Sequence, residues 1–125
     1  MNKKRAFISF DYENDHGLSV LLGGQAKLPD SPFEFQNWSV KKPFPESTWR
    51  SDVRTRIRSC DVVIVIIGAQ TYRADGVIEE IKIANEEGIP CVGVYKEGVS
   101  YYVPSGLSLY AAWTWENLKK IINQV

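Results

Sequence analysis

The chain has 125 residues, of which 44% are hydrophobic and 12% aromatic. This is enough apolar material to form a packed core, and it excludes intrinsic disorder. Fifteen Lys and Arg residues balance fifteen Asp and Glu residues, so the formal net charge is zero and the composition gives no support to nucleic acid as a partner. We expect a single domain over residues 1–125.

Short apolar segments alternate along the chain with segments of helical periodicity. In chain order, the predicted elements are a strand at 6–10, a helix at about 18–28, a strand at 33–38, a helix at about 47–59, a strand at 62–67, a helix at 75–87, strands at 91–95 and 109–113, and a helix at 115–123. Residues 33–38 alternate apolar and polar side chains, as edge strands do, whereas residues 62–67 are apolar throughout, as in a strand covered on both faces. The order predicts an α/β protein with a flavodoxin-like open parallel sheet of about five strands (order 2-1-3-4-5) and helices on both faces.

The first two helical segments each carry an apolar stripe. Three leucines between residues 18 and 22 form the first stripe, and Gly23-Gly24 should leave that helix short or kinked. Trp49, Val53 and Ile57 recur at four-residue spacing and predict the buried face of the second helix. Three arginines on its other side are typical of a solvated face, although they could also steer a phosphate. These are Arg50, Arg54 and Arg58.

The third helical segment contains the acid of greatest interest. Asp75 is its expected N-cap and Gly88 its stop. Four apolar residues share an arc that should face the sheet, with Glu80 on the margin of that arc and Glu79 pointing into solvent. Taken alone, a margin carboxylate is more often an ordinary surface charge than part of a site. The arc consists of Val77, Ile78, Ile81 and Ala84.

The few cysteine and histidine residues argue against two common kinds of active site. Cys60, Cys91 and the single histidine, His16, have neither the spacing of a zinc site nor the partners of a Ser-His-Asp triad. The basic amino terminus is followed by no long apolar stretch, so neither a secretory signal nor a membrane span is predicted. We expect a cytoplasmic protein with reduced thiols, no metal and no membrane attachment.

Ligands of such folds bind beyond the carboxyl ends of the strands, near the switch point between strands one and three. This rule points to the segments that follow the strands at 6–10, 33–38 and 62–67. Asp11 and Tyr12 could contact ribose hydroxyls and a stacked ring, or they could form only a turn before the next helix. The loop at 38–45 could be a lid or a partner-binding surface. The candidate substrate-binding residues are Phe10, Asp11, Tyr12, Trp38, Ser39, Gly68, Thr71 and Tyr72.

Three blocks of the sequence resemble the bacterial TIR-like domain family of the Toll/interleukin-1 receptor superfamily. They are Arg5–Tyr12 (RAFISFDY), the block from Trp49 to Gly68 that ends in IRSCDVVIVIIG, and the block from Thr71 to Ile81 that ends in VIEEI. This branch of the superfamily includes the TIR protein of Thoeris anti-phage defence systems. The likeness covers about residues 5–95.

The resemblance implies cleavage of NAD at the bond between nicotinamide and ribose, with Glu80 as the catalytic residue. NAD would be a substrate rather than a cofactor, and the product an ADP-ribose or cyclic ADP-ribose-type signal that reaches a separate effector protein by diffusion. The resemblance also implies self-association for activity. Many enzymatic members carry Trp four residues before the glutamate, where this chain has Gly76; Tyr72, Trp38 or a second subunit could supply that aromatic wall.

Two other functions remain open at this point. One is a non-catalytic TIR-like protein-interaction module, and the other is a nucleoside deoxyribosyltransferase-like enzyme, which also attacks an N-glycosidic bond with a glutamate. A phospho-receiver domain is set aside because it needs an Asp at the end of the third strand, where this chain has Ile67-Gly68. Nicotinamide release, deoxynucleoside turnover or neither would distinguish the three functions.

Overall fold

The computed structural model describes residues 3–39 and 46–125. In this part of the chain, five parallel strands form one open sheet in the order β2-β1-β3-β4-β5, which confirms the predicted flavodoxin-like fold and strand order. The elements are β1 (Lys4–Ser9), α1 (His16–Ala26), β2 (Phe33–Trp38), α2 (Glu46–Arg58), β3 (Val62–Ile67), a short 3-10 helix η1 (Thr71–Arg73), α3 (Asp75–Glu86), β4 (Cys91–Tyr95), β5 (Leu109–Ala112) and α4 (Trp115–Asn123).

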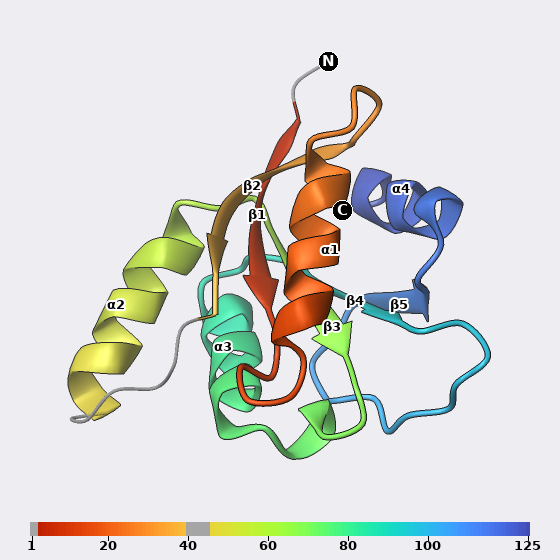
Figure 1. Cartoon of the computed structure of the whole chain (residues 1–125). Coiled ribbons are helices and arrows are strands. Elements are labelled where there is room, and N and C mark those ends of the chain that lie inside the picture. The colour runs from red at the N-terminus through yellow and green to blue at the C-terminus, as the bar shows by residue number, and fades with distance from the viewer. Residues whose placement is uncertain (1–2, 40–45) are drawn as a thin grey trace.

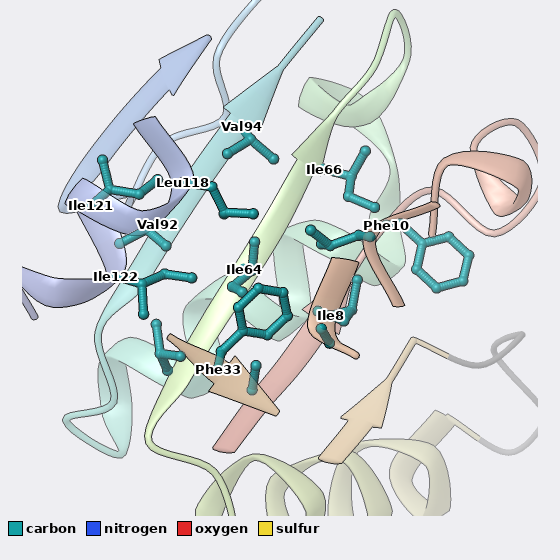
Figure 2. Close-up of a cluster of buried hydrophobic side chains, with 14 residues drawn as sticks. Ile8, Phe10, Phe33, Ile64, Ile66, Val92, Val94, Leu118, Ile121 and Ile122 are labelled. Carbon is teal, nitrogen blue, oxygen red and sulfur yellow. The ribbon is translucent and has the colours of Figure 1, made fainter. Parts of the chain in front are cut away.

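Helices cover both faces of the sheet (Figure 1). Helices α1 and α4 share one core with β1, β3 and β4, and the inward-facing side chains of that core include Ile64 and Ile66 (Figure 2). Helices α2 and α3 cover the other face, where they contact the alternate β3 residues Val63 and Val65. Since successive side chains of a strand point to opposite faces, every residue of β3 is buried. This confirms the prediction of a central strand covered on both sides.

The elements of the second half begin and end close to the predicted residues because their signals are local. Strands β3 and β4 and helix α4 have the predicted bounds, and β5 ends one residue earlier than predicted. Thr114 caps α4, with its Oγ1 accepting a hydrogen bond from the backbone N–H of Asn117 at 3.1 Å. After α3, Gly88 adopts a left-handed conformation (φ 71°) that favours glycine and ends the helix.

Two predictions about helix packing and capping are wrong. Helix α1 continues through Gly23-Gly24 to Ala26, and of its three leucines only Leu22 is buried, while Leu21 is 61% exposed. Leu18 is half-buried and packs against the core beside Leu22, so only Leu21 of the stripe faces solvent. In α3, Asp75 is the first helical residue and Ala74 occupies the N-cap position without a side-chain hydrogen bond.

The arginines of α2 form a largely solvated face, as predicted, with the side chains of Arg50 and Arg58 49% and 62% exposed. On that face they pair with acids of α3 and of the turn that follows it, and a role in steering a phosphate stays a prediction. Arg50 pairs with Glu79 at 3.1 Å, so Glu79 is not the free surface charge that the helical wheel predicts. The other contacts are Arg54 to Glu86 (2.8 Å), Arg54 to Glu87 (2.6 Å) and Arg58 to Glu87 (2.5 Å). The two helices are thus joined by ion pairs beside their shared core.

Candidate active site

A hollow of ≈ 250 Å³ lies at the carboxyl ends of β1 and β2, against the first turns of α3. Its position beside the switch point between β1 and β3 is where open parallel sheets bind ligands. Three segments build it: the loop after β1, the residue after β2 and the start of α3. The lining residues are Phe10, Asp11, Tyr12, Glu13, Ser39, Ala74, Asp75, Gly76, Val77 and Glu80.

Glu80 is an acid in the buried face of α3. Its side chain is only 1% exposed, so it lies in the centre of the buried arc and not on its margin as the sequence predicts. The outward position that this leaves belongs to Ile78, which is 41% exposed. The helix is thus turned so that a carboxyl group, rather than an isoleucine, faces the end of β1.

Two serine hydroxyls hold one oxygen of this carboxyl group. Ser9 Oγ donates a hydrogen bond to Glu80 Oε1 at 2.7 Å, and Ser39 Oγ donates to the same oxygen at 2.5 Å. Ser39 Oγ also accepts a hydrogen bond from the backbone N–H of Phe10 at 3.0 Å, which fixes its position. Among the described residues, no donor or acceptor reaches Glu80 Oε2. The site therefore holds a fixed carboxyl group whose second oxygen is buried and has no hydrogen-bond partner among the described residues.

Burial dominates the protonation of this group. It raises the pKa of Glu80 from its ordinary value of 4.5 to about 8, and the hydrogen bonds from Ser39 and Ser9 oppose that rise. Glu80 is therefore mostly a neutral acid at pH 7 when the hollow is empty. A positive charge nearby would favour the ionised form, so the site is suited to a cationic ligand.

A β-bulge in β2 decides which residues reach the hollow. The register between β1 and β2 shifts by one residue after Phe35, and this inverts the side-chain alternation of the rest of the strand. Trp38 consequently lies on the α1 side, where its ring stacks on Phe35 with centroids 4.8 Å apart. Ser39 turns to the α3 side and meets Glu80.

The structure brings five of the nine predicted site residues to the hollow: Phe10, Asp11, Tyr12, Ser39 and Glu80. Trp38 does not line it, and neither does Tyr72, which stacks on Tyr102 with ring centroids 4.9 Å apart. The aromatic side chains that do line it are Phe10 and Tyr12, stacked with centroids 6.0 Å apart and an interplanar angle of 26°. The proposed lid at 38–45 lies mostly in residues 40–45, outside the described residues.

Gly68 and Thr71 lie behind the loop that lines the hollow. The backbone N–H of Gly68 donates to Thr71 Oγ1 at 2.8 Å, and the same hydroxyl lies 3.3 Å from Asp15 Oδ2. A Cβ atom at Gly68 would lie 2.3 Å from that carboxylate oxygen, so only glycine allows this approach. Burial raises the pKa of Asp15. These residues connect the end of the loop after β1 to the turn after β3.

Asp11 has a structural role as well as a place in the lining. Its Oδ1 accepts a hydrogen bond from the backbone N–H of Glu13 at 3.2 Å, and its Oδ2 accepts one from Asn14 Nδ2 at 2.7 Å. The side chain therefore holds the turn before α1, which is one of the two roles that the sequence left open. Contact with a ribose hydroxyl remains a prediction.

Gly76 leaves space in the wall of the hollow. An added Cβ atom would find only Trp49, at 3.9 Å, within 4 Å. A single methyl group at this position would therefore meet only an ordinary van der Waals contact. Gly76 thus leaves this part of the lining without a side chain.

Ser9 is the clearest residue that the sequence prediction missed. It is a fully buried polar residue in the otherwise apolar segment AFISF. Buried hydroxyl groups need hydrogen-bond partners, so a lone serine in an apolar strand was the available signal. The sequence could not indicate that its partner is Glu80, 71 residues away.

Two further properties follow from the described residues, 3–39 and 46–125. They contain no group of three or more His, Cys, Asp or Glu side chains arranged to hold a metal ion. No helix among them has both the length and the hydropathy needed to cross a bilayer.

Comparison with solved structures supports the fold class. A prokaryotic SEFIR domain matches with a TM-score of 0.56 and 20% sequence identity, covering 98% of this chain and 95% of that domain. The glutaminase domain of the CTPS of Trypanosoma brucei, solved with bound acivicin, matches with a TM-score of 0.47 and 21% identity over 72% of this chain. The matched part is only 35% of that chain, and we draw no conclusion from this weak similarity. The fold is thus that of a TIR-like or SEFIR-like domain.

A match of the amino-acid sequence to a family model identifies the family. The family model described as "Thoeris protein ThsB, TIR-like domain" matches residues 7–101, which is more than half of the chain. The protein belongs to this family. No curated protein matches the chain significantly.

Proposed function

We propose that this TIR-like domain cleaves NAD at the bond between nicotinamide and ribose, with Glu80 as the catalytic residue. The observation that carries the proposal is the state of that side chain: it is buried at the strand tips, held through Oε1 by Ser9 and Ser39, and unpartnered at Oε2. A buried carboxyl oxygen without a partner is costly. A substrate hydroxyl or a developing positive charge would satisfy it.

The reaction needs little beyond one carboxylate. The bond between ribose C1′ and the nicotinamide nitrogen breaks, and its electron pair leaves with nicotinamide, which becomes neutral. Positive charge then develops on C1′ and the ring oxygen, where Glu80 in its ionised form would stabilise it. Water, or a hydroxyl group of the same nucleotide, attacks C1′, and its proton can pass to Glu80.

The protonation of Glu80 fits a cationic substrate. With a pKa of about 8 the empty site is mostly neutral at pH 7, and the positively charged nicotinamide ring would favour the carboxylate as it enters. Tyr12, which is 41% exposed and lines the hollow, offers a ring surface for it, with the buried Phe10 stacked behind. At ≈ 250 Å³ the hollow is small for a dinucleotide, so we place only the nicotinamide and its ribose inside it.

The biological part of the proposal follows from the family. We propose that the product is ADP-ribose or a cyclic ADP-ribose-type nucleotide that acts as a signal in bacterial anti-phage defence and reaches an effector protein by diffusion. Cyclisation rather than hydrolysis would require water to be kept from C1′. Mass analysis of the products separates these two outcomes.

The test is incubation of the purified protein with NAD, followed by measurement of released nicotinamide. We expect release that Glu80→Gln abolishes, since the amide keeps the shape but cannot carry the negative charge. Glu79→Gln is the matched control: it lies on the same helix turn, faces Arg50 and not the hollow, and should keep its activity. Equal release by wild type and Glu80→Gln would overturn the proposal.

Two other outcomes select the alternatives. Turnover of deoxynucleosides without turnover of NAD would indicate a nucleoside deoxyribosyltransferase-like enzyme. Turnover of neither, at every protein concentration, would favour a non-catalytic interaction module.

A further inference from the structure

A second hollow adjoins the one beside Glu80, and its lining is polar. It has a volume of ≈ 450 Å³ and lies between the loop after β1 and the turn after β3, which Figure 1 shows together at the carboxyl ends of the strands. Two of its lining residues also line the Glu80 hollow, so the two hollows are neighbours on one surface. The residues that line this polar hollow are Asp11, Asn14, Gln70, Arg73 and Ala74, and the shared ones are Asp11 and Ala74.

Arg73 is the cation of the polar hollow, and no acid neutralises it. In the part of the chain that the structure describes, every other arginine pairs with a carboxylate, whereas Arg73 has no such partner. Its Nε donates a hydrogen bond to Gln70 Oε1, and the described residues offer no acceptor to Nη1 or Nη2. These two nitrogens are the part of a guanidinium group that binds two oxygens of a phosphate at once.

The turn that carries Arg73 is held in place by its own hydrogen bonds. The backbone N–H of Arg73 donates to the carbonyl oxygen of Gln70, and that of Ala74 donates to the carbonyl oxygen of Thr71, both at 3.1 Å. The side chain of Thr71 is fully buried and lies 3.3 Å from Asp15 Oδ2, in the loop after β1. Because the backbone is fixed in this way, less entropy is lost when Arg73 binds a ligand.

The acidic side chains of this edge determine where an anion can lie. Of the described residues that line the polar hollow, Asp11 is the one acid, and a phosphate next to it would be repelled. Arg73 lines only the polar hollow and Glu80 only the other, with Asp11 lining both. The surface therefore presents, in order, a carboxyl group suited to a cation, a carboxylate that can accept a hydrogen bond from a hydroxyl, and a guanidinium group suited to an anion.

We propose that Arg73 binds the diphosphate group of the dinucleotide substrate. This inference rests on the proposed function for the identity of the ligand. Nicotinamide, ribose and diphosphate follow one another in NAD in the same order as Glu80, Asp11 and Arg73 follow one another along the surface. The Glu80 hollow accommodates only the nicotinamide and its ribose, so the diphosphate leaves it beside Asp11 and meets Arg73. A nucleoside offers Arg73 no phosphate, and the site therefore favours a dinucleotide over a nucleoside.

The expected effect follows from the loss of a charged hydrogen-bond donor. Replacing Arg73 by glutamine should weaken binding of a diphosphate roughly tenfold to a hundredfold, as is usual for hydrogen bonds between charged groups. The side chain is exposed, so salt should screen part of the attraction and the loss should shrink as the ionic strength rises. Arg73→Lys keeps the charge without the paired N–H groups and should bind with intermediate affinity.

The test is titration calorimetry with ADP-ribose, which contains the diphosphate but no bond to nicotinamide and is therefore not cleaved. We expect Arg73→Gln to bind it about tenfold or more weakly than wild type, and to unfold at the same temperature. Arg58→Gln is the matched control, because it removes the same charge from an exposed arginine that precedes β3, at the opposite edge of the sheet, and should bind as wild type does. With NAD, Arg73→Gln should raise KM and leave kcat nearly unchanged.

Three results would overturn the inference. They are a wild-type protein that does not bind ADP-ribose, an Arg73→Gln variant that binds it as tightly as wild type, and an equal loss of affinity in Arg58→Gln. Failure of the proposed function gives a different result, since nicotinamide release would be absent or would survive Glu80→Gln. A loss of ADP-ribose binding in Arg73→Gln would support the phosphate site in that case too. Nicotinamide release that needs Glu80, with an unchanged KM in Arg73→Gln, would overturn the inference alone.

Discussion

The two faces of the sheet depart from the usual distribution of side chains in opposite ways. On the face covered by α2 and α3 an acid, Glu80, is fully buried, while on the face covered by α1 and α4 the α1 residues Val20 and Leu21 are largely exposed. Either departure costs free energy in the isolated chain, since a buried acid loses its hydration and exposed apolar groups order water. Buried polar groups and exposed apolar patches are the informative exceptions in a folded protein. Here they single out the hollow beside Glu80 on one face and the outer side of α1 on the other.

Neighbouring residues at the end of β2 place their side chains on opposite faces of the sheet. The bulge in β2 places Trp38 on the α1 side and Ser39 on the α3 side, next to Glu80. Bulges of this kind redirect side chains and are frequent beside functional sites. The comparison between the two faces can therefore be tested by substitutions at neighbouring positions.

The largest expected effect is a contrast in NAD cleavage between Glu80→Gln and Trp38→Ala. Glu80→Gln should lower the cleavage rate by about 10³-fold or more, because it removes the charge that stabilises the transition state. Trp38→Ala should change the rate less than about twofold, since Trp38 does not line the hollow. Nicotinamide release measures both, and a large loss in Trp38→Ala would mean that the two faces do not act separately.

The next effect is on stability as a function of pH. Because burial raises the pKa of Glu80 from 4.5 to about 8, the folded protein keeps a proton in this range that the unfolded chain has lost. The free energy of unfolding should therefore fall as the pH rises from about 5 to 8, by on the order of a few kcal/mol. Glu80→Gln does not titrate and should remove this dependence, leaving only the smaller contribution of groups such as Asp15. Urea unfolding of both proteins at pH 5 and pH 8 checks it, and parallel pH dependences would contradict the burial of the acid.

A smaller effect is expected at the serine that holds the acid. Ser39→Ala removes a hydrogen bond that lowers the pKa of Glu80, so that pKa should rise further. The pH at which kcat/KM reaches half its maximum should move upward, and the rate at pH 7 should fall about tenfold. A pH–rate profile distinguishes this from a general loss of folded protein, which would lower the rate equally at every pH. Ser31→Ala is the matched control, since Ser31 is a buried serine whose hydroxyl bonds to the backbone of Phe33, away from the hollow.

The smallest predicted effect concerns Gly76. Gly76→Ala adds a Cβ that meets only Trp49, at an ordinary contact distance of 3.9 Å. We expect the free energy of unfolding to rise by about 0.5–1 kcal/mol, because alanine loses less backbone freedom than glycine on entering a helix. Thermal unfolding measures this change. A destabilised variant would mean that the open wall of the hollow is needed for folding, and not only for the entry of a ligand.

Much of the fold could be predicted because its signals are local. The apolar run of β3, the stop at Gly88 and the cap at Thr114 act within a few residues, and the corresponding bounds agree with the structure. The helical wheel of α3 was less reliable, since it placed Ile78 in the core and Glu80 at the edge. In the structure Glu80 faces inward and accepts hydrogen bonds from Ser9 and Ser39, which are 71 and 41 residues away in sequence. Periodicity within one helix contains no information about such partners.

The residues of the candidate site were likewise predicted only in part. The topological rule led to the loop after β1, and the family resemblance led to Glu80; the structure brings them together at one hollow. Trp38 and Tyr72 were expected there from their positions in the chain, and the structure places both elsewhere. The catalytic role of Glu80 stays a prediction until nicotinamide release is measured.

By itself, the amino-acid sequence determined the order of the elements, the parallel sheet and the family. The reason is that hydrophobic periodicity and short capping signals depend only on residues close together in the sequence. Only the tertiary structure decided that Glu80 is buried with one oxygen unpartnered. It also decided that the side chains of Trp38 and Ser39 lie on opposite faces of the sheet, and that apolar side chains of α1 face outward. Each of these depends on the phase of one element relative to another, and a one-residue shift in a strand or a small rotation of a helix changes it without changing the local pattern.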